Sequence, residues 1–225
     1  FTDPEVGYVQ AAQAYENQDA SFIARGAAEE TYGYYSSIQM AAYGLGYPIV
    51  VGCHNTHRTA ALKAVGGFAP HDADDLLITM LYRIGGWRGV YVPKILARGL
   101  TPCDWNGYVG QQRRWTRSIL DLKLRHFPRL GRSLPSGSRF ISRVHGLNYL
   151  IRTLAVPVWL SLLAVVLVRG RPEAGMIEQM IPSMIGITLA IAACEVYRQR
   201  FYLDPDSEGG LHWRAALLQL AKWPT

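Results

Sequence analysis

The sequence predicts an α/β fold that continues into membrane-associated helices. Up to about residue 104, short apolar runs that suit strands alternate with helical segments, an order typical of an α/β layer with a largely parallel sheet. Beyond Asp104 the chain becomes basic and amphipathic and then carries two uncharged apolar stretches. Charged residues make up only 18% of the chain, below the ~25% usual for soluble domains. This composition favours membrane contact and argues against disorder.

Local patterns define the elements of the first part, residues 1–104. The expected strands are Glu5–Gln10, Ile49–Cys53 and Val90–Ile95. The expected helices are Ser21–Tyr43, Thr59–Val65 and Asp74–Ile84. Each of the last two ends at a Gly-Gly pair, which suits a helix C-terminus.

Residues 105–146 are expected to form amphipathic helices at a membrane interface. In Tyr108–His126, apolar and aromatic residues recur at helical spacing with cationic residues between them. Residues 111–152 hold ten Lys or Arg and one acid, Asp121. Such a block suits anionic lipid headgroups or a phosphorylated ligand. The alternative is an ordinary surface helix on a soluble core.

Residues 147–225 contain two candidate transmembrane helices. Thr153–Val168 and Ile181–Cys194 carry no charge, and each approaches the ~20 residues of a membrane span when extended at one end. The alternative is a pair of helices buried in a soluble protein. The preceding cations place that flank in the cytosol. We therefore expect a multi-pass protein of the inner or plasma membrane with a cytosolic catalytic part. Leu211–Trp223 is a further amphipathic segment, either a second interface helix or the start of another span.

The three cysteines, Cys53, Cys103 and Cys194, show no Cys-x-x-Cys spacing. A zinc knuckle or disulfide framework is therefore not expected, and reduced thiols fit a cytosolic location.

The segment His71–Leu77 is the first candidate for chemistry, because it places three carboxylates at a loop-to-helix junction. One interpretation is structural: Asp72 or Asp74 caps the helix, and acids in the first turn are favoured by its dipole. The functional interpretation is a general base that removes a proton from an acceptor hydroxyl. A metal site that combines His71 with these acids is a third possibility.

The second candidate is the run Gln111-Gln112-Arg113-Arg114-Trp115. On a helix, Gln111, Arg114 and Trp115 share one face. The guanidinium suits a diphosphate, and the indole offers a sugar or base a flat apolar surface. The alternative is an interface helix whose Trp and basic neighbours contact lipid.

Together these two motifs resemble those of processive family 2 glycosyltransferases, which include the cellulose, hyaluronan and chitin synthases. Ala73-Asp74-Asp75 resembles the family's Thr-Glu-Asp, and Gln111–Trp115 resembles its Gln-x-x-Arg-Trp motif. The stretch Val50–Arg58 is similar to a strand-turn of the family, with His54 where Asn or Cys is common, and Ala61–Phe68 is similar to the segment that follows it. The resemblance implies the C-terminal part of a GT-A-like nucleotide-diphospho-sugar transferase domain. It implies Asp75 as the catalytic base with Asp74 beside it, and substrate binding by Gln111, Arg114 and Trp115 together with Arg113 and His54.

The implied reaction is the inverting transfer of a hexose from a nucleotide-sugar, UDP-glucose or similar, to a growing β-linked polysaccharide. The resemblance also implies Mg²⁺ or Mn²⁺. Because the chain begins at Phe1 and shows no Asp-x-Asp before Gly52, we expect the metal and nucleotide ligands mainly upstream of this chain. Expected partners are the donor, a polysaccharide or glycolipid acceptor and membrane lipids, but no nucleic acid. The alternatives are a non-processive enzyme similar to ceramide glucosyltransferase and a non-enzymatic, basic membrane-binding module.

Overall fold

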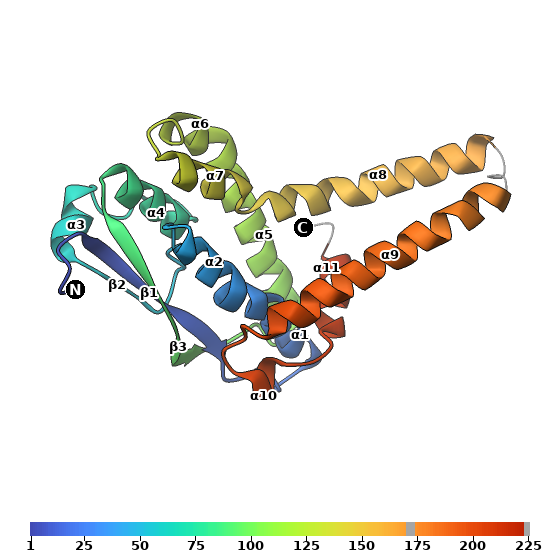
Figure 1. The fold of residues 1–225 in the computed structure, drawn as a ribbon, viewed down its shortest axis with the longest axis horizontal. Coiled ribbons are helices and arrows are strands. Elements are labelled where there is room, and N and C mark those ends of the chain that lie inside the picture. The colour runs from blue at the N-terminus through green and yellow to red at the C-terminus, as the bar shows by residue number, and fades with distance from the viewer. Residues whose placement is uncertain (170–173, 223–225) are drawn as a thin grey trace.

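The computed structural model describes residues 1–169 and 174–222 (Figure 1). Its body contains a small sheet surrounded by helices. Two long helices, α8 (Leu147–Arg169) and α9 (Ala174–Gln199), project away from this body. The α/β organisation of the first segment therefore agrees with the sequence prediction.

The sheet has three strands in the order β2-β1-β3. The central strand β1 (Val6–Tyr15) pairs in parallel with β3 (Arg88–Gly99) and antiparallel with β2 (Asn55–His57). The predicted strands at residues 5–10 and 90–95 are confirmed, and both extend further. The prediction of a largely parallel sheet holds for only one of the two pairings, because β2 returns along β1 in the opposite direction.

The helices of the first segment pack around β1. Residues 22–44 form one helical stretch, as predicted, but its middle is a π-helix. The three parts are α1 (Phe22–Gly33), η1 (Tyr34–Ile38) and α2 (Gln39–Gly44). The predicted helices α3 (Thr59–Ala64) and α4 (Asp74–Ile84) are confirmed. Tyr8 of β1 packs against Ile78 and Tyr82 of α4, and Tyr15 packs against α1.

The predicted strand Ile49–Cys53 is wrong. Ile49 and Val50 are buried but lie in no sheet. Side chains, rather than a neighbouring strand, bind the backbone of this segment. The N–H groups of residues 49, 50 and 51 donate in turn to Gln39 (3.1 Å), Thr79 (2.9 Å) and Gln10 (2.8 Å). A run of apolar residues predicts burial, but it does not reveal which groups will bind the backbone.

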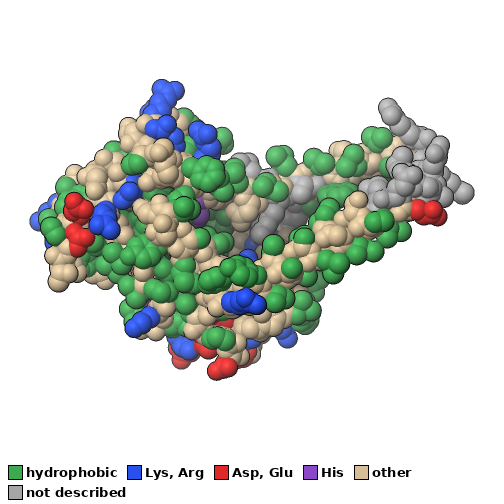
Figure 2. All heavy atoms as spheres, in the orientation of Figure 1, with side chains coloured by type: hydrophobic (Ala, Val, Ile, Leu, Met, Phe, Trp, Pro, Cys, Tyr) green, Lys and Arg blue, Asp and Glu red, His purple; other side chains and the backbone are tan. Residues whose placement is uncertain are grey.

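The second segment, residues 105–146, is largely helical. It comprises α5 (Trp105–Asp121), the π-helix η2 (Leu122–His126), α6 (Phe127–Leu130) and α7 (Ser136–Val144). The predicted helix Tyr108–His126 is confirmed and begins three residues earlier, where Asp104 accepts a hydrogen bond from the N–H of Gly107 (2.9 Å). Leu77 and Met80 of α4 pack against Leu122 and Leu134, so α4 lies against the end of α5. Figure 2 shows basic side chains gathered over α6 and α7.

The projecting helices expose large apolar side chains, among them Trp159 (69% exposed) and Ile187 (61% exposed) (Figure 2). Within the described residues, one segment, Ile181–Gln199, is long and apolar enough to cross a membrane, and none of its most apolar window is buried. The apolar part of α8, Val156–Val168, is shorter. One of the two predicted spans thus has the length and composition that a membrane-spanning helix requires. The exposed apolar side chains of both helices do not fit the alternative of a pair of helices buried in a soluble core.

The chain then returns to the body through α10 (Pro205–Glu208) and α11 (Trp213–Ala221). Leu218 of α11 packs against Ala27 of α1 and Tyr108 of α5. The predicted amphipathic segment Leu211–Trp223 therefore packs against the body through α11. Trp223, like residues 170–173, lies outside the described residues.

Candidate active site

The three carboxylates of the first motif have different roles at the start of α4. Ala73 occupies the N-cap position, so neither acid caps the helix in the expected way. Asp74 accepts a hydrogen bond from the N–H of Asp75 (2.9 Å), and Asp75 accepts one from the N–H of Leu76 (2.7 Å). Asp72 is exposed. The two acids predicted to be catalytic are thus fixed in the first helical turn.

Asp75 also reaches across to a second loop. Its Oδ2 accepts a hydrogen bond from the N–H of Gly52 (3.2 Å). Burial raises the pKa of the Asp75 carboxyl above its ordinary value, and the charge of Asp74 acts in the same direction, while the Leu76 and Gly52 N–H groups oppose them. A carboxylate with a raised pKa is a stronger base than an exposed one, which suits proton removal.

Tyr34 of η1 and Cys53 lie close enough to Asp75 to share its electrostatics. Burial raises the pKa of each group, and the Asp75 charge contributes to both increases. Tyr34 in turn hydrogen-bonds His145 Nε2 (3.2 Å), just before α8 begins. The surroundings of Asp75 are therefore connected through Tyr34 to the base of the projecting helices.

His54 has an unusual conformation beside this loop. It is the one non-glycine residue with a positive φ (56°) among the described residues, and its Nδ1 is buried without a hydrogen-bond partner. Positive φ is costly for a residue with a side chain and recurs at functional sites. His54 lies two residues after Gly52, whose N–H binds Asp75. The sequence did not indicate its strained backbone conformation.

The second motif lies on α5 and divides between two sides of that helix. Gln112 is buried and accepts a hydrogen bond from Lys222 (2.9 Å), which also binds Glu30 of α1. Gln111 and Trp115 are half-buried, and Arg114 is exposed. Within the described part of the chain, no side-chain hydrogen bond or ion pair engages Gln111, Arg113 or Arg114. These groups are therefore available to a ligand.

The flank of α5 that carries Gln111 can be followed to the end of the helix. At about 100° per residue, Gln111, Arg114 and Asp121 lie within roughly 80° of arc, and Trp115 borders this arc on the buried side. Arg113 lies about 100° from Arg114, toward the outer face. Of the predicted substrate-binding residues on this helix, Gln111 and Arg114 therefore lie on one flank with Trp115 at its border, and Arg113 lies apart from them.

The C-terminal end of this flank contacts the loop that leads to Asp75. His71 Nε2 lies 3.0 Å from Asp121 Oδ2, four residues before Asp75. The contact joins the acid-bearing loop to the C-terminal end of the Gln111–Arg114 flank, although no hydrogen bond joins Asp75 itself to Gln111, Arg114 or Trp115 in the described residues. The link between the two predicted groups of site residues therefore runs through His71 and Asp121.

His71, Asp121 and His126 also come within 4.8 Å of one another, which makes them the one candidate metal cluster among the described residues. The geometry argues against ligation. The Ala73 N–H donates to His71 Nδ1 (2.9 Å), so the ring proton lies on Nε2, the nitrogen that faces Asp121. Asp121 is also paired with Arg125 (3.0 Å). Mg²⁺ and Mn²⁺ prefer oxygen-rich sites. These residues do not fit the expected ion, and we derive no step through a metal.

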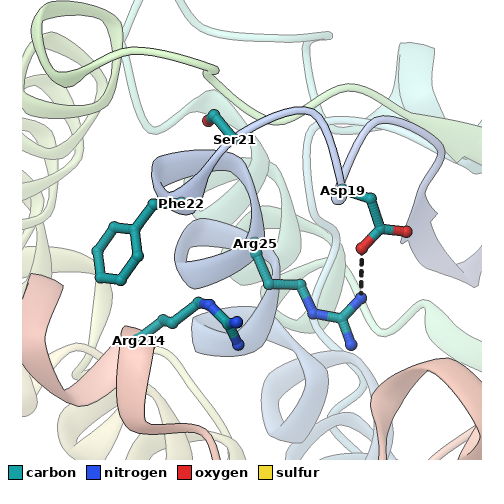
Figure 3. A pocket seen from close by; sticks show the side chains of 5 residues that line it. All are labelled: Asp19, Ser21, Phe22, Arg25 and Arg214. Carbon is teal, nitrogen blue, oxygen red and sulfur yellow. Dashed lines mark hydrogen bonds and ion pairs between the residues drawn. The ribbon is translucent and has the colours of Figure 1, made fainter.

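A separate cleft lies away from these residues. A cleft of about 550 Å³ opens between the starts of α1 and α11 and is lined by Asp19, Ser21, Phe22, Arg25 and Arg214 (Figure 3). Both arginines are already paired, Arg25 with Asp19 (3.1 Å) and Arg214 with Glu29 (3.4 Å). None of the predicted site residues lines it, so we do not place the active site there.

Comparison with known proteins identifies the family and supports the fold. Residues 1–193 match the model of the family described as glycosyl transferase family group 2. The chain belongs to that family. Its structure is similar to that of a mannosyltransferase from Pyrobaculum calidifontis solved with GDP-Man and Mn²⁺, with a TM-score of 0.51 and 20% identity. That similarity supports a GT-A-like α/β fold. It covers 97% of this chain but 55% of the mannosyltransferase, so the chain spans about half of that protein. No functionally curated protein matches.

Sequence reasoning missed the residues that support the site. Gln10, Gln39 and Thr79 hold the Ile49–Val51 backbone, and His71 with Asp121 joins the two motifs. Only the last pair left a signal: Asp121 continues the helical stripe of Gln111 and Arg114 and is the single acid in a basic block. The buried glutamines look like ordinary polar residues until their backbone partners are known.

Proposed function

We propose that this chain contributes to the inverting transfer of a hexose from a nucleotide-sugar to a growing β-linked polysaccharide at the cytosolic face of a membrane. The observation that carries the proposal is that Asp75, a partly buried carboxylate with a raised pKa, begins α4 directly after a loop that contacts the end of the α5 flank with Gln111 and Arg114. Family membership supports the class of reaction.

In the proposed reaction, Asp75 accepts the proton of the acceptor hydroxyl while that oxygen attacks the anomeric carbon. The bond between the anomeric carbon and the diphosphate oxygen breaks, and its electron pair leaves with the nucleoside diphosphate. Single displacement inverts the anomeric configuration. Arg114, which has no carboxylate partner among the described residues, is placed to stabilise the developing negative charge through its planar fork of donors. Trp115 forms the apolar floor for the acceptor sugar, and Gln111 orients it.

Membrane attachment follows from the exposed apolar surfaces of α8 and α9. A helix that is apolar on all sides must be surrounded by protein or lipid. We propose that both helices span the membrane, α8 with the help of its flanking residues, and that the basic surface of α6 and α7 contacts anionic headgroups.

The test uses the complete membrane-bound enzyme with two donors, UDP-glucose and GDP-mannose. The first follows from the resemblance of the motifs, and the second is the donor bound by the similar mannosyltransferase. We expect Asp75→Asn to abolish sugar transfer while the affinity for the donor is retained, because the base is lost and the diphosphate contacts remain. Asp72→Asn, an exposed neighbour, is the matched control. Retained turnover in the Asp75→Asn enzyme would remove Asp75 from the mechanism. A product limited to one added sugar would favour a glycolipid-forming enzyme.

A further inference from the structure

We infer that His71 and Asp121 are positioning residues that fix the separation between Asp75 and the Gln111–Arg114 flank of α5, and thereby the width of the acceptor site. This inference rests on the proposed function. Neither residue touches the reacting atoms in this account. They act by joining the two elements that do.

Both ring nitrogens of His71 are used, and each one binds a different element. Nδ1 accepts the N–H of Ala73 (2.9 Å), which ties the ring to the loop just before α4. Nε2 must then carry the proton and donate it to Asp121 Oδ2 (3.0 Å), the last residue of α5. The ring also packs edge-on against His126 (5.1 Å between centroids). His71 therefore has one tautomer and one orientation, as a rigid spacer requires.

The register of α5 transmits this contact to the substrate-binding side chains. Asp121 lies on the same flank as Arg114, seven residues further on, or about 10 Å along the axis. A helix held at Asp121 cannot rotate about its axis without moving Arg114 and Gln111 relative to the loop. On the other side, only three residues separate His71 from Asp75, and the intervening Ala73 is hydrogen-bonded to the same ring.

The contact adds little to overall stability, which separates its role from that of a core residue. The side chains of His71 and Asp121 are 12% and 29% exposed, and the contact is a single hydrogen bond from a neutral imidazole, whose net contribution to folding is modest. Leu77, Met80, Leu122 and Leu134 hold α4 against this end of the second segment independently of the pair. Loss of the pair should therefore misplace the site without unfolding the protein. A misplacement of about 1 Å can cost up to about 100-fold in rate.

The test is a double-mutant cycle in the complete membrane-bound enzyme. We expect His71→Phe and Asp121→Leu each to lower kcat by about 10- to 100-fold, with little change in the KM for the donor or in the thermal midpoint. The double variant should be no worse than either single variant, because each removes the same contact. His71→Gln, which keeps an N–H donor, should recover part of kcat. Arg125→Gln removes the other, 79%-exposed partner of Asp121 and is the matched control.

A distance measurement separates failure of this inference from failure of the proposed function. Spin labels at Asp72→Cys and Arg117→Cys, both exposed, report the position of the loop relative to α5 in a background without the native cysteines. We expect the distance distribution to broaden in His71→Phe whether or not transfer is measurable. An unchanged distribution, or single-variant losses that multiply in the double variant, would overturn the positioning role. So would an Arg125→Gln enzyme as impaired as Asp121→Leu.

Discussion

At the scale of single residues, Asp75 combines structural hydrogen bonds with the proposed role of general base. Its two oxygens accept N–H groups from Leu76 and Gly52, yet burial keeps its pKa raised. The sequence left capping and catalysis as alternatives. In the structure Asp75 lies in the first turn rather than at the cap, and each of its oxygens keeps a second lone pair for the acceptor hydroxyl of the proposed reaction.

The charge of Asp74 provides a test of Asp75 by pH. The base works when deprotonated, so transfer should fall as the pH falls through the Asp75 pKa. Asp74 contributes to raising that pKa. In Asp74→Asn the amide oxygen can still accept the Asp75 N–H, but the charge is gone. We expect the acidic limb of the kcat profile to move to lower pH, and the exposed Asp72→Asn variant to leave it in place. A limb that stays fixed or moves to higher pH in Asp74→Asn would contradict this assignment.

At the scale of elements, the extended segment from Ile49 to Gly52 matters most for the site. It brings the Gly52 N–H to Asp75, and it is held by side chains of β1, α2 and α4 rather than by a sheet. Thr79 makes two of these connections, since its hydroxyl accepts the Val50 N–H and donates to the Asp75 carbonyl (2.7 Å). The segment is therefore hydrogen-bonded to α4 through both Thr79 and Asp75.

Removal of the Thr79 hydroxyl should loosen this connection. Thr79→Val keeps the shape of the side chain but leaves the buried Val50 N–H without a partner, which should lower the free energy of unfolding by about 1–3 kcal/mol. Thr59→Val, at an exposed position at the start of α3, is the control and should change it by less than about 0.5 kcal/mol. Denaturation in detergent measures both. Equal stability of the two variants would show that the side-chain bonds to this segment contribute nothing measurable.

The elements that could be predicted from the sequence are those in which apolar residues recur with a clear helical period. The helices α4 and α5 have regular apolar spacing and clear ends, and their predicted bounds agree with the structure to within a few residues. The segment Ile49–Cys53 failed because burial alone does not distinguish a strand from a backbone bound by side chains. The π-helices η1 and η2 were not predicted, because the change from α to π pairing inside a helix leaves the apolar pattern almost unaltered.

At the scale of the whole molecule, the cysteines offer a natural test of the membrane arrangement. Cys103 and Cys194 are both exposed in the structure, the first beside α5 and the second on α9. If lipid surrounds α9, a charged maleimide in opened membranes should label Cys103 but not Cys194, and detergent should make Cys194 accessible. The measurement is mass spectrometry of the labelled peptides in a Cys53→Ser background. Prompt labelling of Cys194 before detergent would show that α9 lies in water.

The candidate site was predictable in its parts but not in its assembly. The sequence supplied Asp75 and the Gln111–Trp115 run because acids at a helix start and an Arg-Trp pair have recognisable chemistry. It did not reveal that Gln112 faces inward to Lys222, or that His71 and Asp121 meet, because both contacts join residues far apart in the chain. Long-range packing, rather than local pattern, decides which members of a motif face the substrate.

The central claim is that Asp75 and the Arg114 flank of α5 border one space, and cross-linking tests it most directly. In the complete protein without native cysteines, Asp75→Cys is paired with Arg114→Cys or with Thr116→Cys, which lie about 160° apart on α5. A bifunctional maleimide that spans about 10 Å, the axial distance between Arg114 and Asp121, is added, and linked peptides are quantified. The account predicts efficient linkage of positions 75 and 114 and little between 75 and 116. Equal yields, or preferential linkage to position 116, would contradict it.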